Sequence, residues 1–526
     1  MSMPSSSSGS SYGGSGPSSS GTRQSAGGAS GPVSGAVSEA VSGAVSRAGG
    51  DACPGALRLH RADDGALARV RLPGGVLAVA QADALARAAR RLGDGVLHLT
   101  SRGNVQLRGL GDGCGAELAD LLTGAGLLPS ARRERIRNVV ASPLSGLDEP
   151  GNGNGNGNAD VGPWLRELDA LLVGGAPGLE ALSGRFLFAL DDGRGDVGAL
   201  GADVTLTAAA DGGALLRLAG CGHTALRVPG GLAARAAAVA AAVFLDAADA
   251  VAGVAGGGGG GGSSGTDAVR GGPPRGIWRI GELPDAVRGN LLREVAHRLT
   301  RGTGTDIHAT ADRISADRAS AATGAPGVAE VSGAVGGPSP GAVPGPDSGR
   351  VALCVGIPFG RISGDQWRLL TDCARDDGRG ELRLTPWRGV VVPAVAAARA
   401  DAWLARFAAA GLVTAPGSPW RGVGACVGHP GCAKSLADVR ADAADVVRAG
   451  AYRPSAAGPA VVELPVYWSG CERRCGRPPG DRVDVVAVPE GYRISVVGAD
   501  RPSAASVRVA CGPDLTAAVA GARRVP

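Results

Sequence analysis

Two pairs of cysteines near the C-terminus have the type and spacing to bind a metal group. Cys426 and Cys432 form a C-x5-C pair, and Cys471 and Cys475 form a C-x3-C pair. Four thiolates that converge from two loops can hold an iron–sulfur cube or a tetrahedral zinc ion. Structural zinc pairs usually have about two to four intervening residues, so the wider first spacing favours the cluster. Unpaired structural thiols are the alternative, but the other cysteines are scattered singly.

Glycine and proline surround both pairs. Gly428, Pro430 and Gly431 lie within the first spacing, and Gly470 and Gly476 flank the second. Tight turns of this kind leave backbone N–H groups without intrahelical or ladder partners. We therefore expect some of these N–H groups to point at the cysteine sulfurs.

Length and composition set the outer limits on function. A chain of 526 residues is expected to hold roughly three or four domains. The 53 basic and 48 acidic residues nearly balance, so no nucleic-acid-binding face is expected. Lys434 is the one lysine, and the abundance of Arg, Ala and Gly indicates a GC-rich coding bias. Arginine counts alone are therefore weak evidence for an anion site.

The N-terminus lacks a basic segment followed by an apolar core, so we do not expect a secretory signal. The longest apolar stretch, Ala236 to Leu245, is too short to span a bilayer. A cytoplasmic protein with reduced cysteines and no membrane partner is expected, and that compartment favours metal ligation over disulfides.

Low-complexity segments divide the chain. The predicted organisation is a disordered Ser/Gly-rich tail (1–50), a first half-domain with the start of the domain that follows (51–150), a flexible linker (151–161), a first larger α+β domain (162–254), a low-complexity linker with a short helical segment (255–349), a second half-domain (350–413) and a cysteine-bearing domain (414–526). The glycine run 256–262 has no Lys-Ser/Thr ending, which favours a linker over a phosphate loop.

The two half-domains are predicted to be copies of one another. Leu72-Pro73-Gly74-Gly75 resembles Ile357-Pro358-Phe359-Gly360, and Leu97-His98-Leu99-Thr100 resembles Leu382-Arg383-Leu384-Thr385. A third pair, Ala125-Gly126-Leu127 and Ala410-Gly411-Leu412, follows at equal spacing. Repeated spacing between three anchors indicates a duplication.

Each copy has the pattern strand, helix, strand, strand, helix. In the first copy the pattern predicts helices at 82–92 and 114–124 and strands at 95–100 and 104–109. This order suits an α+β fold with helices on one face of an antiparallel sheet.

The two halves differ in chemistry after the repeats. The first continues as Arg137-Asn138-Val139-Val140-Ala141-Ser142, and the second as Gly422-Val423-Gly424-Ala425-Cys426. If Ala141 corresponds to Ala425, Ser142 stands where Cys426 stands. We therefore expect a pseudo-twofold molecule with one cluster and a substrate cleft between its halves.

These motifs resemble the siroheme-dependent nitrite and sulfite reductases, which combine two ferredoxin-like half-domain repeats with larger α+β domains. The C-x5-C and C-x3-C motifs, the stretch Thr100 to Gln106, Arg137-Asn138-Val139 and Ser183-Gly184-Arg185-Phe186 carry the resemblance, over about 70–135, 180–225, 350–412 and 420–500. Where reductases show Lys-Phe-Lys, this chain has Arg185-Phe186-Leu187. Loss of the second cation, together with LTSRGNVQLRGL, RNVVASPLSGLD, FALDDG, LTPWRGVVVP and CVGHPGCAKSLADVRADA, resembles the precorrin-3B synthase branch of that family.

The resemblance implies an O2-dependent monooxygenase that hydroxylates precorrin-3A at C20 with γ-lactone formation, in aerobic cobalamin synthesis. It implies a [4Fe–4S] cluster, a mononuclear non-haem iron, and NADH as electron source through a partner reductase or ferredoxin. An arginine-lined cleft fits a macrocycle with many carboxylates, because guanidinium groups bind carboxylates bidentately.

The candidate site residues follow from these motifs. The predicted catalytic residues are Arg102, Arg137 and Arg185. The predicted substrate-binding residues are Arg102, Gln106, Arg108, Arg137, Asn138, Arg185 and Arg388, the last on the matching strand of the second half. The alternative for each arginine is an ordinary surface charge, and for Gln106 and Asn138 an ordinary strand or turn position.

Ligands for the second iron are not evident. A non-haem iron usually takes two histidines and a carboxylate. The chain has His60, His98, His223, His297, His308 and His429, and none lies in a paired motif. Asp191 and Asp192 form an acidic turn that a hairpin loop explains.

Three functions remain open from the sequence: the monooxygenase, a siroheme-dependent nitrite or sulfite reductase, and an electron carrier with one cluster. A duplicated scaffold with a cleft exceeds what electron transfer requires, which disfavours the carrier. A tetrapyrrole would fill the same cleft as substrate or as siroheme cofactor, so the sequence does not separate the first two.

Overall fold

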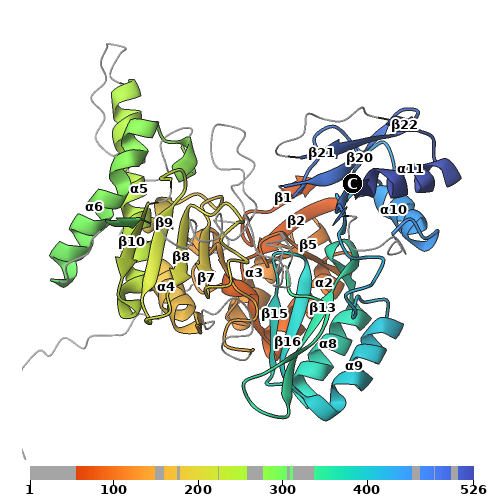
Figure 1. The fold of residues 1–526 in the computed structure, drawn as a ribbon, viewed down its shortest axis with the longest axis horizontal. Coiled ribbons are helices and arrows are strands. Elements are labelled where there is room, and N and C mark those ends of the chain that lie inside the picture. The colour runs from red at the N-terminus through yellow and green to blue at the C-terminus, as the bar shows by residue number, and fades with distance from the viewer. Residues whose placement is uncertain are drawn as a thin grey trace, which may run out of the picture.

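The computed structural model describes residues 55–148, 159–174, 178–222, 224–256, 277–304, 309–311, 337–452, 462–478, 480–498 and 507–525. The predicted tail 1–50, the insert 151–158 and about half of the predicted linker 255–349 lie outside the described residues. The described part is a mixed α+β structure with four sheets of five or six strands and a two-stranded pair (Figure 1). This confirms the predicted fold class.

The first half-domain has the predicted order of elements. Its elements are β1 (His60–Ala62), β2 (Gly65–Val70), β3 (Val76–Ala78), α2 (Val79–Leu92), β4 (Val96–Leu99), β5 (Val105–Leu110) and α3 (Gly115–Gly124). The helix predicted at 82–92 begins earlier, at Val79, and buries one face of mostly alanine and leucine side chains. The other three predicted elements agree to within a residue at each end.

The second half-domain repeats this order. Its elements are β12 (Gly341–Pro344), β13 (Arg350–Gly356), β14 (Arg361–Ser363), α8 (Gly364–Asp376), β15 (Glu381–Leu384), β16 (Gly389–Ala396) and α9 (Ala397–Ala409). The sheet already begins with β12, which pairs antiparallel with β13. Residues 341–344 therefore belong to this sheet, although the sequence placed them in the preceding linker.

The two half-domains exchange a strand. β3 of the first half pairs with β15 of the second, and β14 of the second half pairs with β4 of the first. The turns before these strands use left-handed backbone at Gly75 and Gly360. A Cβ on Gly75 would lie 1.9 Å from the Leu384 carbonyl oxygen, so only glycine permits this approach of the two chains.

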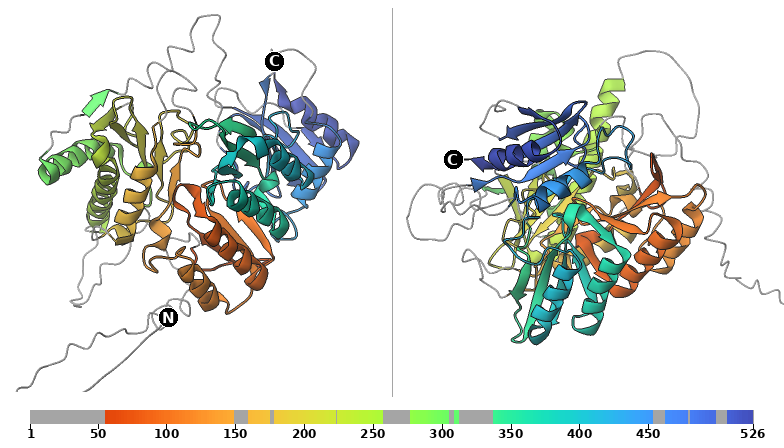
Figure 2. Two further views of the ribbon diagram at one scale, coloured as in Figure 1. Left: turned by 90° about the horizontal axis from the view of Figure 1, so that it is seen from below. Right: turned by 90° about the vertical axis from the view of Figure 1, so that its right-hand side faces the viewer.

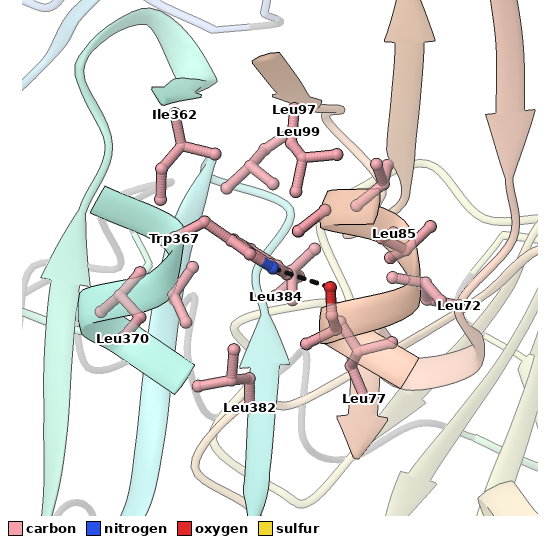
Figure 3. Packing of buried hydrophobic residues seen from close by; sticks show 14 of the residues in the cluster. Leu72, Leu77, Leu85, Leu97, Leu99, Ile362, Trp367, Leu370, Leu382 and Leu384 are labelled. Atoms are coloured by element: carbon pink, nitrogen blue, oxygen red, sulfur yellow. Dashed lines mark hydrogen bonds between the residues drawn. The ribbon is translucent and has the colours of Figure 1, made fainter. Parts of the chain in front are cut away.

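One hydrophobic core joins the halves. Leu72, Leu77 and Leu85 of the first half pack in the same cluster as Ile362 and Leu384 of the second (Figure 3). The Trp367 indole of α8 lies in this core, and its N–H donates to the Ala82 carbonyl of α2 over 2.9 Å. A buried indole N–H needs such a partner, so this bond fixes how α8 lies against α2.

A larger domain follows each half. The first contains the sheet β6 (Val139–Ala141), β7 (Phe188–Asp191), β8 (Val204–Ala208), β9 (Ala214–Leu218), β10 (Thr224–Val228) and β11 (Ala309–Ala311), with helices α4 (Gly162–Gly174), α5 (Ala233–Gly256) and α6 (Asp285–Thr303). In the described residues one segment, Gly230–Ala252, is long and apolar enough to cross a membrane, with mean hydropathy 1.6. It is 61% buried and packs against β8 and β9, as a core helix does.

The second larger domain has the same strand order. Its elements are β17 (Val423–Ala425), α10 (Val439–Arg448), β18 (Val462–Glu463), β19 (Val466–Ser469), β20 (Arg482–Val488), β21 (Gly491–Val497), β22 (Val507–Val509), α11 (Pro513–Arg523) and β23 (Arg524–Val525). Strands β17, β19 and β20 are parallel and β21 and β22 antiparallel, as in β6 to β10. The half-domains lie between the two larger domains, with their helices on the outer side (Figures 1 and 2).

Candidate functional site

The two cysteine pairs lie on adjacent loops at one end of the β17–β19 sheet. Ala425 pairs with Trp468 in the parallel ladder, and the Cys426 N–H donates to the Trp468 carbonyl over 2.9 Å. Both cysteine loops therefore leave the sheet side by side. The Leu436 N–H then donates to the Gly470 carbonyl over 2.8 Å and ties the end of the first loop to the second.

Backbone amides point at the first cysteine sulfur. The Gly470 N–H donates to Cys426 Sγ over 3.2 Å, as predicted from the glycine turns. Burial raises the pKa of the Cys426 thiol, while amide hydrogen bonds from Gly470 and Gly428 lower it. Amides that favour the thiolate are what a cysteine ligand requires.

The four thiols are not arranged as the ligands of a single bound zinc ion. No three of the four Sγ atoms lie within 4.8 Å of one another. Zinc–sulfur bonds of about 2.3 Å would bring four tetrahedral ligands to about 3.8 Å apart. Cys426, Cys432, Cys471 and Cys475 are the four thiols that these two loops offer to a polynuclear group.

A buried carboxylate anchors the second cysteine loop. Asp484 on β20 forms ion pairs with Arg474 and Arg477, each at 3.4 Å, and with Arg482 at 2.8 Å. Only 1% of its side chain is exposed. Because a buried carboxylate needs such compensation, the loop that carries Cys475 is held to the sheet by charge.

Arg108 joins the first half-domain to the first cysteine loop. Its guanidinium forms two hydrogen bonds to Asp64, of 2.8 and 2.7 Å, and one of 3.0 Å to the Gly431 carbonyl between Cys426 and Cys432. Asp63 also accepts from the Ala433 N–H over 2.6 Å. Arg108 thus uses Nε and Nη2 to place the loop, and the substrate contact predicted for it stays a prediction.

A row of polar side chains crosses the first sheet on the face of Arg108. Arg69, Gln106, His98 and Arg361 occupy directly opposed positions on β2, β5, β4 and β14. The alternating residues Leu97, Leu107 and Ile362 point into the shared core instead. Opposed residues share a face, so this row is directed away from the helices and toward the cysteine loops.

The matching row in the second sheet is nearly apolar. Its positions are Cys354, Val391, Arg383 and Val76. Cys354 and Val391 pack with Leu144 and Leu147, and Arg383 donates to the carbonyls of Pro143 and Ser145. One sheet therefore presents polar chemistry, while its duplicate serves as a packing surface.

Further cations lie beside the polar row. Arg440 of α10 donates to the Cys426 carbonyl over 3.0 Å. Burial lowers its pKa to about 10, and the nearby cations Arg361, Arg108 and Arg388 add to this effect. Such crowding of positive charge is unfavourable unless an anionic group, such as a carboxylate-rich ligand or an anionic cluster, compensates it.

Arg388 belongs to this group of cations. It lies in the turn between Thr385 and Gly389 with φ of 59°, and so precedes β16 instead of lying on a strand as predicted. The neighbouring Tyr467 donates to the Cys475 carbonyl over 2.6 Å. Burial raises the pKa of Tyr467 to about 12, so the phenol stays a neutral donor.

The remaining predicted residues have separate settings. Arg102 lies in the Thr100–Asn104 turn, where Thr100 Oγ accepts from its N–H over 3.3 Å. Arg137, with 8% of its side chain exposed, is bound bidentately by Asp169 at 2.7 and 2.8 Å. The Asn138 amide accepts from Arg71 and donates to the Phe186 carbonyl. Arg137 and Asn138 therefore have clear tasks in packing.

Arg185 is exposed and faces a different segment. Its guanidinium lies 5.0 Å from the Trp278 ring centroid and 3.5 Å from Glu282. These contacts join the segment that precedes β7 to residues 277–282 of the same domain. No contact of Arg185 with a cysteine loop is found among the described residues.

In the first larger domain, the loops that correspond to the cysteine loops hold an ion-pair network. Arg194 donates to Asp148 and to Asp192 through bonds of 2.6 to 3.0 Å. Ser142 Oγ donates to Asp196 over 2.6 Å. Burial raises the pKa of Asp196 to about 7, and the adjacent Asp191 adds to the shift.

This acidic group does not suit the expected second iron. Asp191, Asp192 and Asp196 are the only three potential ligands in the described chain whose ligand atoms lie within 4.8 Å of one another. The group contains no histidine, and Arg194 already neutralises part of its charge. We therefore derive no step through an iron here. The acidic turn predicted as a loop is more than a hairpin, because it holds a buried network.

Two hollows lie on the helical side of the half-domains. One of about 570 Å³ lies on the helical side, lined by residues of α2 and α3 that include Arg87, Arg91 and Glu117. None of the predicted site residues lines it. The site is instead defined by the convergence of the polar row, the cations and the cysteine loops.

Sequence reasoning missed Arg361 and Arg440 and gave His98 no role at the site. Arg361 reaches the first sheet only through the exchanged strand, and Arg440 only through α10. The one sequence pattern that could have indicated Arg361 is the alternation of polar Arg361 and Ser363 around apolar Ile362. The structure buries Ile362 and exposes the two polar residues.

Comparison with known proteins agrees with this architecture. A family model described as "Nitrite/Sulfite reductase ferredoxin-like half domain" matches residues 59–122 and 344–410, the two half-domains. The chain is 25% identical to a precorrin-3B synthase of Sinorhizobium sp over 454 residues, which covers 85% of this chain and 83% of that one. It is 32% identical to the chloroplastic ferredoxin–nitrite reductase of Zea mays over 23% of this chain and 21% of the relative.

A solved structure shares the fold. The Mycobacterium tuberculosis NirA protein superposes with a TM-score of 0.58 at 18% sequence identity, over 84% of this chain and 77% of that chain. The expected relationship to precorrin-3B synthase and the nitrite/sulfite reductases is thereby confirmed.

Proposed function

We propose that this protein is an oxygen-dependent monooxygenase acting on precorrin-3A. Two of its regions match the nitrite/sulfite reductase ferredoxin-like half domain, and the chain is similar to a precorrin-3B synthase over most of its length. The ferredoxin–nitrite reductases among the relatives are oxidoreductases by name, which supports that coarser class. The specific reaction is hydroxylation at C20 with γ-lactone formation, in the cytoplasm.

The observation that carries the proposal is the collection of cations beside the cysteine loops. Arg361, Arg388 and Arg440 come from β14, the turn before β16 and α10, and the first two add to the lowering of Arg440's pKa that burial causes. A macrocycle bearing many carboxylates matches this charge, because guanidinium groups bind carboxylates with fixed geometry. Gln106, in the middle of the polar row, can hydrogen-bond its edge.

The four cysteines would hold a [4Fe–4S] cluster, which supplies single electrons when bound. The chain's own residues then have three tasks: Arg102, Arg361 and Arg388 orient the substrate, Arg108 and Asp484 hold the cysteine loops, and Tyr467 stays protonated beside Cys475. The overall change consumes O2, two electrons and two protons, and gives one oxygen atom to the product and one to water. NADH supplies the electrons through a partner reductase or ferredoxin.

The alternative is siroheme-dependent reduction of nitrite or sulfite. The similarity to ferredoxin–nitrite reductases favours it, although that similarity covers about a fifth of the chain. The replacement of the reductase Lys-Phe-Lys by Arg185-Phe186-Leu187 counts against it, because Leu187 is 2% exposed and apolar. An anion site that loses a cation loses charge stabilisation in the transition state.

The deciding experiment is anaerobic binding of precorrin-3A followed by exposure to ¹⁸O2. We expect a product with one labelled oxygen atom and a protein whose absorbance is that of a cluster alone. Isolation with a bound siroheme chromophore, no binding of precorrin-3A, and rapid reduction of nitrite or sulfite would establish the alternative.

A further inference from the structure

His98 stands at the centre of the polar row beside the cysteine loops. Gln106 lies opposite it on one side and Arg361 on the other. The residue is 9% exposed, whereas its strand neighbours Leu97 and Leu99 point into the apolar core. A buried imidazole on a polar, site-facing row needs an explanation that packing does not supply.

Asp94 connects this imidazole to the surface. The His98 Nε2 and Asp94 Oδ2 atoms are 3.4 Å apart. The Asp94 side chain is 34% exposed and the His98 side chain 11%, so the pair runs from solvent to the buried face. Asp94 is itself held in place, because its other oxygen accepts from the Val96 N–H and its own N–H donates to the Arg108 carbonyl.

The charges around His98 favour the neutral ring. Burial lowers the pKa of His98, and Arg440 and Arg108 lower it further, while Asp94 raises it. Arg361, opposite His98 on β14, adds a further positive charge to this surrounding. A neutral imidazole whose one nitrogen faces a carboxylate can accept a proton and pass it on from the other nitrogen.

The proposed reaction requires protons at this face. Reduction of one oxygen atom of O2 to water takes two protons, which must reach the face of the sheet where the substrate is proposed to bind. We propose that Asp94 and His98 form a proton relay from solvent to the substrate-binding face of the first sheet. This role rests on the proposed function, since it supplies the protons that the monooxygenation consumes.

The duplicated half provides an internal comparison. The position that matches His98 is Arg383, which is engaged with the backbone of Pro143 and Ser145. An arginine cannot release its proton near neutral pH. A residue able to exchange protons is therefore found at this position only in the half whose sheet faces the cluster.

The test compares His98→Gln, Asp94→Asn and His297→Gln, the last a control at an exposed position of α6. We expect His98→Gln to keep its iron content and its anaerobic affinity for precorrin-3A within about twofold, and to lose roughly 10²-fold in turnover. Asp94→Asn should lose less turnover than His98→Gln. It should also shift the pH profile of turnover to lower pH, because Asp94 raises the pKa of His98. Added imidazole should restore part of the turnover in His98→Ala.

Three results would overturn the relay. They are turnover within twofold of wild type in His98→Gln, an equal loss of substrate affinity and turnover, and no effect of imidazole on a folded, cluster-loaded His98→Ala protein. The first would show that protons arrive by another route. The second would show a binding role.

A substrate-free measurement separates this inference from the proposed function. NMR of histidine-labelled protein should show His98 titrating below the ordinary imidazole pKa of 6.5 in wild type, with a still lower pKa in Asp94→Asn, because Asp94 raises the pKa of His98. Absence of any titration would refute the relay whichever reaction the protein performs. If His98 titrates as expected but wild type does not oxygenate precorrin-3A, the proposed function fails while the Asp94–His98 coupling stands.

Discussion

Ser142 occupies in the first half of the molecule the position that Cys426 occupies in the second. The Ser142 N–H donates to the Leu190 carbonyl over 3.0 Å, and the Cys426 N–H donates to the matching Trp468 carbonyl over 2.9 Å. The side-chain atoms are equivalent too. Ser142 Oγ accepts from the Asp192 N–H over 3.2 Å, as Cys426 Sγ accepts from the Gly470 N–H over 3.2 Å. The two loops have thus kept one backbone plan with different chemistry.

The first prediction concerns the cluster. Replacement of Cys426, Cys432, Cys471 or Cys475 by Ala should lower the iron and sulfide content of anaerobically prepared protein and abolish turnover, because each removes a ligand. Cys511→Ala, at an exposed cysteine outside the pairs, should retain the cluster. Full iron and sulfide content in Cys471→Ala would refute the assignment.

The second prediction concerns Arg194. Arg194→Ala should destabilise the protein by about 3–5 kcal/mol, because the buried carboxylates of Asp148 and Asp192 lose their cation. Arg185→Ala, which removes a largely exposed guanidinium, should change stability by less than about 1 kcal/mol. Thermal unfolding of both variants would compare them, and equal small shifts would contradict a structural role for Arg194.

The third prediction is a pH dependence from Asp196. Its pKa is raised to about 7 in the folded protein, above the ordinary carboxyl value of 3.8, so the folded state holds the proton more tightly than the unfolded state. The stabilising contribution is therefore present at low pH and is lost as pH rises toward 7. Asp196→Asn cannot ionise and still accepts from Ser142, so its advantage in unfolding temperature over wild type should grow as pH rises from 3.8 to about 7 and level off above that. A constant difference would disprove the shift.

The fourth prediction tests the strand exchange. Gly75→Ala places a methyl group against the Leu384 carbonyl, whereas Gly95→Ala has the same left-handed backbone with no atom within 4 Å. Gly95→Ala should cost about 1–2 kcal/mol from its positive φ alone. Gly75→Ala should cost about 1–3 kcal/mol more from the overlap. Similar unfolding midpoints for the two variants would show that the contact of β3 with β15 tolerates movement.

The fifth prediction separates arginines that bind from arginines that pack. Arg102→Ala should weaken precorrin-3A binding by about 1.5–3 kcal/mol with the unfolding temperature unchanged. Arg137→Ala should lower the unfolding temperature first, because it leaves Asp169 without its buried partner. Equilibrium binding and calorimetry on the same preparations distinguish the two outcomes.

The local order of elements could be predicted from the sequence, and the long-range contacts could not. Equal spacing between Pro73 and Thr100 and between Pro358 and Thr385 sufficed for the repeated helices and strands, because those depend on short-range periodicity. The exchanged strands β3 and β14 are short. Their own residues do not indicate that each strand pairs with the sheet of the other half.

The site was predictable in the same uneven way. The cysteine spacing carried its own information, and the amide contact from Gly470 follows from glycine turns. The partner of an arginine is set by tertiary packing, which is why Arg108 and Arg137 were expected to bind substrate although Asp64 and Asp169 engage them.

The strand exchange also constrains the order of events during synthesis. β4 forms the edge of its sheet until β14 is available to pair with it, and β14 lies far downstream in the chain. The nascent first half therefore emerges from the ribosome with an open edge strand, which is a template for pairing with other chains. Completion of the sheet must wait until the second half has been translated.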